Sequence, residues 1–472
     1  MAATDSTIEL PAPGFWASVR EALAGSTHDF STGPLGRAIL LLAVPMVLEM
    51  AMESVFAVSD AYFVGRLGAD ALATVGLTES MLAVVYALAM GLGVGATALV
   101  ARRTGEKDAE GAARAGATAV AVGLALSVVL GAAGAVLAPR LLVLMGAPAG
   151  VLATGTGYAR VMLGGEASII LLFVANAIFR GAGDAAIAMR TLWLANGINI
   201  VLGPLLIFGP GPFPALGVTG AAIATTIGRS TGAGYALWRL TRPTSRVPLR
   251  RRDFGFDRAV VARIVEVSGA AAAQAMIGTA SWIGLVRVVA TFGATALAGY
   301  TITMRIIVFA ILPAFGMSNA AATLVGQALG ARDPARAERA VWTTGHYNAA
   351  FLGVLGLGFV AAAPAIAGVF TRDPGVLRYA TDGLRVDALG FPLYAYGLVF
   401  TAAFNGAGDA RTPTVLNLGV FWLFEIPVAY GLARTLGMGP HGVFVAIALA
   451  FSMLAGASGG VFRGGRWKTR VV

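Results

Sequence analysis

Three carboxylates lie within the first long apolar run of the chain, at Glu49, Glu53 and Asp60. At 100° per residue, Glu53 lies about 40° and Asp60 about 20° from Glu49 around a helix, so the three share one stripe. Placing an acidic side chain inside a membrane span costs free energy, so its presence there indicates a functional site. Crowded, poorly solvated carboxylates can take up and release a proton near neutral pH. The structural alternatives are a partnered carboxylate or, for Asp60, a place near a wet helix end.

Neighbouring side chains extend this candidate site. Glu79 and Glu166 add acidic character to the same half of the chain. Pro45 removes a backbone donor and is expected to bend the first span, which would couple protonation to helix shape. A predicted substrate cleft for organic cations also needs an apolar lining, and methionine and aromatic side chains are suited to this role. Its predicted residues are Glu49, Glu53, Glu79, Met52 and Phe56.

Charged residues of the second half of the chain give weaker support for a role in transport. Asp387 lies close to Arg385, so a local ion pair explains it as well as a transport role does. Glu425 precedes Ile426-Pro427, where a proline frees backbone carbonyls. Arg229 of the first half and Arg287 and Arg305 of the second also fall within apolar runs and keep an anionic substrate open; they are the basis of one rival hypothesis.

Composition places the chain in a membrane. Of its 472 residues, 57% are hydrophobic and only 12% are charged, and the mean hydropathy is +0.78. A soluble domain carries roughly 25% charged residues. The chain has no cysteine, and its histidines are far apart, so disulfides and thiolate metal sites are excluded. No catalytic triad, metal-ligand spacing or phosphate-binding loop stands out, so we expect a transporter and not an enzyme.

Apolar runs of about 20 residues predict twelve membrane spans, and no secretory signal peptide precedes them. The expected organisation is a cytoplasmic N-terminal segment (1–35), an N-lobe with spans 1–6 (36–240), a basic cytoplasmic linker (241–262), a C-lobe with spans 7–12 (263–462) and a cytoplasmic tail (463–472). The runs are 38–64, 72–100, 115–138, 158–179, 188–208, 217–238, 264–290, 297–325, 341–363, 380–404, 413–433 and 441–462.

The distribution of lysine and arginine predicts the orientation. The termini and the even-numbered loops hold 24 of them, and the odd-numbered loops hold six. Because basic residues are retained on the cytoplasmic side, both termini are expected in the cytoplasm of a multi-pass inner-membrane protein. The net charge of +10 is then explained by topology and by contact with the lipid bilayer, and no nucleic-acid partner is expected.

The two halves repeat at a constant offset of 225 residues. Phe179 and Gly181-Ala-Gly-Asp184 align with Phe404 and Gly406-Ala-Gly-Asp409. Each half holds six spans, and because six is even, both halves enter the membrane from the same side. The sequence therefore predicts an all-α membrane protein of twelve helices in two parallel six-helix repeats.

The motifs as a set resemble the multidrug and toxic compound extrusion (MATE) transporters, over roughly residues 36–462. They are Pro45 to Asp60 followed by Tyr62-Phe-Val-Gly-Arg-Leu-Gly68, Leu99-Val100 with Gly105, Arg180-Gly-Ala-Gly-Asp184, and Gly217-Val-Thr-Gly-Ala-Ala-Ile-Ala-Thr225. The resemblance is closer to the DinF-like branch than to the NorM-like branch, which places a glutamate in span 7. It implies a V-shaped pair of lobes and cation-coupled efflux of amphipathic, often cationic drugs by a monomer.

The resemblance also implies a cation site in the N-lobe. Its span 1 acid matches Asp60, its span 5 asparagine matches Asn199, and its span 6 threonine matches Thr225, with Glu53 as a further candidate. The family often has Asn-x-x-x-Asp-Pro in span 5, whereas this chain has Gly203 in place of the second acid. Sodium needs several oxygen ligands and a proton needs one carboxylate, so proton coupling is favoured, with sodium as the other candidate ion.

The main hypothesis is therefore a proton-coupled antiporter for small organic molecules that works by alternating access and needs no organic or metal cofactor. The rival hypothesis is a lipid-linked glycan flippase or polysaccharide exporter, which would use basic residues in the cleft. A membrane-embedded enzyme or receptor is a third class, and the missing catalytic residues and the full-length duplication argue against it.

Overall fold

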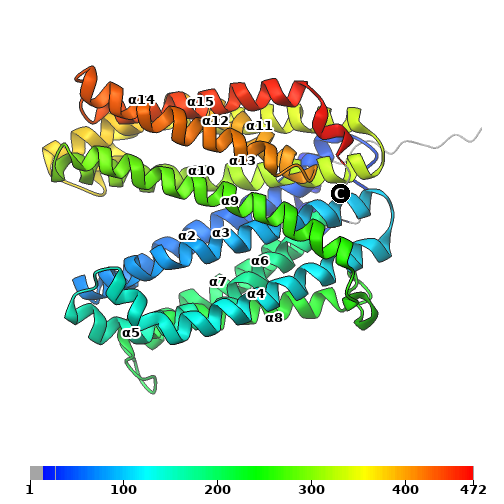
Figure 1. Cartoon of the computed structure of the whole chain (residues 1–472), viewed down its shortest axis with the longest axis horizontal. Coiled ribbons are helices and arrows are strands. Elements are labelled where there is room, and N and C mark those ends of the chain that lie inside the picture. The colour runs from blue at the N-terminus through cyan, green and yellow to red at the C-terminus, as the bar shows by residue number, and fades with distance from the viewer. Residues whose placement is uncertain (1–13, 27, 471–472) are drawn as a thin grey trace, which may run out of the picture.

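Helices joined by short loops make up the computed structural model, which describes residues 14–26 and 28–470 (Figure 1). The start of the expected N-terminal segment 1–35 and the end of the expected tail 463–472 lie outside these residues. The first half contains α1 (Phe15–Ala24), α2 (Leu35–Gly65), α3 (Ala69–Gly105), α4 (Ala109–Leu144), α5 (Ala149–Gly164), α6 (Glu166–Gly181), α7 (Ala185–Phe208) and α8 (Gly217–Leu240).

The second half follows a short 3-10 turn, η1 (Arg251–Phe254). It contains α9 (Arg258–Ala290), α10 (Ala294–Gly330), α11 (Pro334–Gly368), α12 (Pro374–Gly406), α13 (Arg411–Asn417), the π-helix η2 (Leu418–Glu425), α14 (Ile426–Tyr430), the π-helix η3 (Gly431–Thr435), α15 (His441–Arg463) and the 3-10 turn η4 (Arg466–Thr469). The segment from α13 to η3 forms one span-length helical stretch.

Eleven helical segments among the described residues are long and apolar enough to cross a membrane, counting α5 with α6 as one. The twelfth expected span is α8, which has 24 residues and is long enough for a bilayer, although it is richer in glycine and threonine. The prediction of an all-α protein of twelve spans is confirmed. Several helices run beyond the apolar runs, and an aspartate side chain caps the start of α4, α9, α11 and α12.

The predicted repeat extends to backbone detail. Asp108 accepts a hydrogen bond from the amide three residues ahead and so caps α4. We call the residue at the equivalent position of the other half, 225 residues away, its mate. The mate of Asp108 is Asp333, which caps α11 in the same way. The residues just before these caps, Lys107 and Arg332, both have positive φ, at 60° and 59°. Two halves that share such uncommon backbone conformations at the offset of 225 share one local fold.

Two bundles form, α2–α8 and α9–α15, and their ribbons converge at the end where the C-terminus lies (Figure 1). Each has its own buried apolar core, with Leu92 and Ile170 in the first and Leu384 and Phe444 in the second. We call the bundles the N-lobe and the C-lobe. Each lobe buries its own apolar surface, so the lobes can move as units.

Glycines bring the lobes together in mated pairs. A Cβ added to Gly91 in α3 would lie 2.8 Å from Ala272 of α9, and one added to Gly316 in α10 would lie 2.8 Å from the amide nitrogen of Val47 in α2. Gly316 is the mate of Gly91, and Ala272 is the mate of Val47. The same close contact therefore occurs twice, related by a pseudo-two-fold axis.

The axis passes near Ala101 and its own mate Gly326. The Ala101 methyl group would lie 2.6 Å from a Cβ at Gly326. A Cβ on Gly105 would lie 2.0 Å from the carbonyl oxygen of Gln327, and one on Gly330 would lie 2.2 Å from the carbonyl oxygen of Arg102. These contacts lie in the C-terminal halves of α3 and α10, at the end expected to be cytoplasmic.

The N-terminal latch, residues 28–34, bridges the lobes at this same end. The Arg336 guanidinium of α11 donates hydrogen bonds to the carbonyl oxygens of Phe30, Thr32 and Gly33 at 2.8–3.1 Å. Phe30 is only 2% exposed, and Arg246, in the linker after α8, donates to the carbonyl of His28 at 3.3 Å. Lys107, between α3 and α4 of the N-lobe, lies 3.8 Å from Asp29 of the latch, so residues from both lobes and from the linker hold it.

Candidate functional site

The three carboxylates of the α2 stripe meet three different partners. Glu49 is buried and forms an ion pair with Arg180 at the end of α6, with 2.7 Å between Oε1 and Nη1. The side-chain amide of Asn176 donates a second bond to the same oxygen at 3.3 Å. Glu49 is therefore held inside the N-lobe by a cation of the chain itself.

One turn further along α2, Glu53 accepts a hydrogen bond of 2.9 Å from the side-chain amide of Asn196 in α7. Glu53 also interacts electrostatically with Arg229 of α8. Arg229 is only 8% exposed, and its guanidinium donates to the Tyr86 hydroxyl and lies 5.7 Å from the centre of the Phe56 ring. A buried arginine between two aromatic rings is thus the positive centre of the N-lobe interior.

Asp60 and Glu79 complete this cluster. Asp60 is partly buried near the end of α2 and interacts electrostatically with Arg229. Glu79 is an exposed residue of α3 that interacts with Asp60 and Arg229, and also with Arg305 from α10 of the other lobe. Glu79 and Arg305 therefore place opposite charges across the boundary between the lobes.

The structure brings the two predicted neutral ligands together. The Asn199 amide in α7 donates to the Thr225 hydroxyl in α8 at 2.7 Å, and both residues are buried. A Cβ at Gly203 would lie 3.8 Å from the Asn199 side-chain oxygen, so a side chain there would reach this pair. No hydrogen bond joins Asp60 to either residue among the described interactions.

The charges of this cluster do not balance. Glu53, Asp60 and Glu79 offer three negative charges when ionised, against the single positive charge of Arg229 within the N-lobe. An uncompensated charge within a membrane span is costly. The cluster can reduce its net charge by binding protons or by attracting an organic cation, and either ligand would act on the same carboxylates.

The remaining predicted residues lie on the same helix or face other groups. Pro45 is buried within α2, which continues through it from Leu35 to Gly65. Met52 is partly buried on α2. Glu166 is buried at the start of α6, and its Oε2 has no hydrogen-bond partner in the part of the chain that the structure describes. Arg385 donates a hydrogen bond to the carbonyl of Val360.

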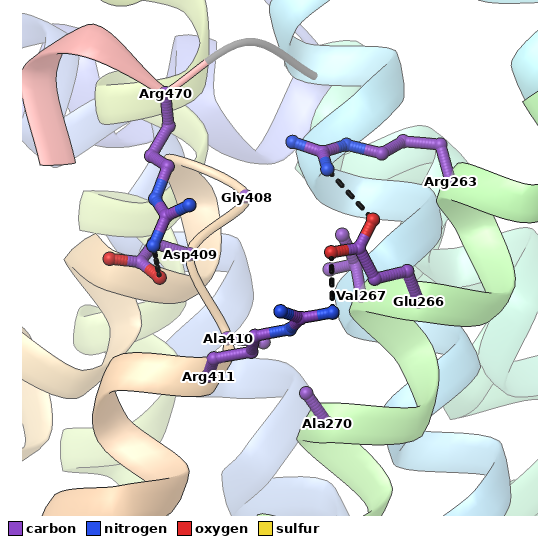
Figure 2. A pocket seen from close by; sticks show the side chains of 9 residues that line it. All are labelled: Arg263, Glu266, Val267, Ala270, Gly408, Asp409, Ala410, Arg411 and Arg470. Atoms are coloured by element: carbon purple, nitrogen blue, oxygen red, sulfur yellow. Dashed lines mark hydrogen bonds and ion pairs between the residues drawn. The ribbon is translucent and has the colours of Figure 1, made fainter.

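A small pocket at the end expected to be cytoplasmic contains acids and arginines that satisfy one another (Figure 2). Arg470 pairs with Asp409 at 3.2 Å, and Glu266 pairs with Arg411 at 3.0 Å and with Arg263 at 2.9 Å. The mate of Asp409 is Asp184, which interacts with Arg246. Each repeat thus ends in an arginine that reaches back to its own loop aspartate, and we assign this pocket to structure.

Comparison with known proteins decides the family. The MatE family model matches residues 45–205 and 270–431, two segments that begin 225 residues apart. The chain belongs to the MatE family of multidrug and toxic compound extrusion transporters. The expected resemblance is confirmed at the level of the family, and the members found are transporters and not enzymes.

The relatives span almost the whole chain. A protein named probable multidrug resistance protein YoeA of Bacillus subtilis is 26% identical, over 90% of this chain and 93% of its own length. A protein of Shewanella oneidensis named FAD transporter is 27% identical, over 85% and 89%. A solved structure described as the outward-facing conformation of a multidrug resistance MATE family transporter has a TM-score of 0.88 at 28% identity, over 93% of this chain and 98% of its own. This MATE transporter therefore has the two-lobe fold of the family.

Sequence reasoning missed how the central cluster is organised. It placed Arg229 among basic residues for an anionic substrate, whereas the structure places it beside the acids. It did not single out Asn196, the partner of Glu53, or Arg180, the partner of Glu49. A signal was present, because an arginine buried in a span needs an acid nearby, but the partners lie on helices that are distant in sequence.

Proposed function

We propose that this MATE transporter is a proton-coupled antiporter of the DinF-like branch that exports amphipathic, often cationic molecules by alternating access. The observation that carries the proposal is the N-lobe cluster, in which Glu53 and Asp60 interact with Arg229, and Glu79 interacts with Arg229 and with Arg305 of the C-lobe. The relatives named as multidrug resistance proteins support the substrate class. We further propose that it works as a monomer in the inner membrane with both termini in the cytoplasm.

Competition for charge would couple the two fluxes. Ionised Asp60 is attracted to Arg229 and leaves the cluster negative enough to hold an organic cation. Protonation of Asp60 removes one negative charge and so weakens the hold on the cation. Because a ligand shifts a conformational equilibrium only by its differential affinity for the two states, proton and drug must favour different states. Asn199 and Thr225, bonded to each other, are the neutral oxygen donors that would complete a site for sodium.

The conformation fits an outward-facing state. The close glycine contacts and the N-terminal latch both lie at the end expected to be cytoplasmic. The similarity to a structure described as outward-facing supports the same assignment. Alternation would then require these contacts to open.

The glycan-flippase alternative is not favoured. Of the three arginines that kept it open, Arg229 is buried and donates to Tyr86, so it is not free for a pyrophosphate, whereas Arg287 and Arg305 are exposed. One relative is named FAD transporter, so flavin dinucleotide is a suitable anionic comparison substrate.

The test is transport into proteoliposomes of ethidium under an imposed pH gradient or sodium gradient. Wild type, Asp60→Asn and Asn199→Ala are compared with Asp70→Asn, an exposed aspartate at the start of α3. We expect transport driven by the pH gradient in wild type and Asp70→Asn and its loss in Asp60→Asn. Transport driven only by sodium would overturn proton coupling, and full activity of Asp60→Asn would remove this residue from the site. Flavin transport without ethidium transport would overturn the substrate class.

A further inference from the structure

A second polar cluster lies buried in the C-lobe. Asp387 of α12 is 0% exposed and Glu425, the last residue of the π-helix η2, is 1% exposed. Among the described residues, neither Asp387 oxygen has a hydrogen-bond partner, and neither does the Glu425 Oε2. The two carboxyl groups interact electrostatically with each other. The local ion pair of Asp387 with Arg385 that the sequence left open does not form, since Arg385 donates elsewhere.

Two tyrosines face this pair. Tyr300 of α10 and Tyr394 of α12 both interact electrostatically with Asp387 and Glu425. The Tyr300 hydroxyl is itself buried and has no hydrogen-bond partner within residues 14–26 and 28–470, an observation independent of the acids. The Tyr300 ring stacks on Phe444 at 6.0 Å, and the Tyr394 ring stacks on Phe451 at 3.6 Å. Phe444 and Phe451, both on α15, thus position the two tyrosines.

The fold does not require polar groups at these positions. At the offset of 225, Tyr300, Asp387 and Tyr394 correspond to Val75, Met162 and Ile169, which are buried apolar residues of the N-lobe. The same architecture is therefore built with hydrocarbon in one lobe and with hydroxyl and carboxyl groups in the other. If the polar residues of the C-lobe served only for packing, apolar residues would serve as well there, as they do in the N-lobe.

Burial without a cation decides the protonation state. No arginine, lysine or histidine interacts with either carboxyl in the part of the chain that the structure describes. Two ionised carboxylates cannot remain together in an apolar interior without a positive charge. A carboxylic acid can donate to its neighbour, and the tyrosine hydroxyls can donate to the remaining oxygens.

We propose that Asp387 and Glu425 form a proton-binding site inside the C-lobe that holds at least one proton when the transporter is outward-facing. Tyr300 and Tyr394 donate hydrogen bonds to the carboxylate that results when one proton leaves. The π-helix that ends at Glu425 fits this role, since such turns occur often at functional sites. The site is separate from the N-lobe cluster and does not depend on how Asp60 couples to transport.

The test is infrared difference spectroscopy of the full chain in liposomes at neutral pH, which detects the carbonyl stretch of a protonated carboxyl group. Subtracting the spectrum of Asp387→Asn with Glu425→Gln from that of wild type should leave a protonated-carboxyl band that shifts in heavy water. The control is Asp382→Asn on the same helix, because Asp382 is partly exposed and lies 2.9 Å from His441. That variant should leave the band unchanged.

A second variant guards against misfolding. Asp387→Met copies the residue that the N-lobe has at the mate position, and its melting temperature should equal or exceed that of wild type. Absence of the difference band would overturn the proposal. A sodium-dependent rise in melting temperature that disappears in the double variant would overturn it in favour of a metal cation. Loss of ethidium transport in Asp60→Asn is a separate readout, so the two proposals fail independently.

Discussion

Closing the lobes at the end proposed to be cytoplasmic should depend on two glycines at equivalent positions of the repeat. The perturbation is Gly105→Ala together with Gly330→Ala, in α3 and α10. The added methyl groups would lie 2.0 Å and 2.2 Å from the carbonyl oxygens of Gln327 and Arg102, whereas ordinary contact begins at 3.4 Å. The two helices must therefore separate by more than about 1 Å where they now touch.

Overpacking of this kind costs about 1–3 kcal/mol. If the strain is present only in the closed state, the ratio of closed to open conformers falls about 5-fold to 150-fold. The chain has no cysteine, so a pair of spin labels can be attached at Ala109→Cys and Ala335→Cys without background. Both positions are exposed at the start of long helices, one in each lobe.

We expect the distance distribution between these labels to shift towards longer values in the alanine variant, measured in liposomes. The control is Gly76→Ala, also in α3, where an added Cβ has no atom within 4 Å. An unchanged distribution in the double variant, or the same shift in the control, would refute the idea that these glycines set the closed state.

Three further predictions concern the N-lobe and the latch. Glu49→Gln should lower stability by about 3–5 kcal/mol because it leaves the largely buried Arg180 without its acid, as measured by thermal unfolding in detergent; normal stability with lost transport would instead place Glu49 in the substrate cleft. Arg336→Gln should speed hydrogen exchange of the latch, since hydrogen bonds from a charged donor contribute about 1.5–3 kcal/mol each, and Arg339→Gln, an exposed neighbour, should not. Burial and nearby arginines lower the pKa of His28, so docking of the latch should strengthen as pH rises towards the ordinary value of about 6.5 and be lost below it. Hydrogen exchange that keeps this pH dependence in His28→Gln would assign it to another group.

Most of the fold could be predicted from the sequence because its determinants are local. Apolar runs of bilayer length predict the spans, and the offset of 225 predicts the two lobes. The same offset relates Gly91 to Gly316 and Gly105 to Gly330, which form equivalent contacts across the axis. The repeat identifies which residues occupy equivalent positions, but it does not show which helix each residue contacts. The contacts between the lobes therefore could not be predicted from the sequence.

The candidate site could be predicted only in part, for a similar reason. Helical periodicity placed Glu49, Glu53 and Asp60 on one stripe and suggested that they act together. In the structure, Glu49 is neutralised by Arg180 and Glu53 is bonded to Asn196, residues more than 100 positions away. Which acids remain free to bind a cation is decided by these tertiary partners, and periodicity along one helix carries no information about them.

Comparison of the two halves can identify functional residues that helical periodicity does not. A polar residue whose mate is apolar is not demanded by the shared architecture, and in a membrane interior it is costly. Applied to the C-lobe, this comparison separates Asp387, whose mate is Met162, from Arg385, whose mate is Arg160. The first is the buried carboxyl without a partner, and the second bonds a backbone carbonyl. Here the different residues at 162 and 387 thus support a functional role for Asp387, and the arginines at both 160 and 385 support a structural one.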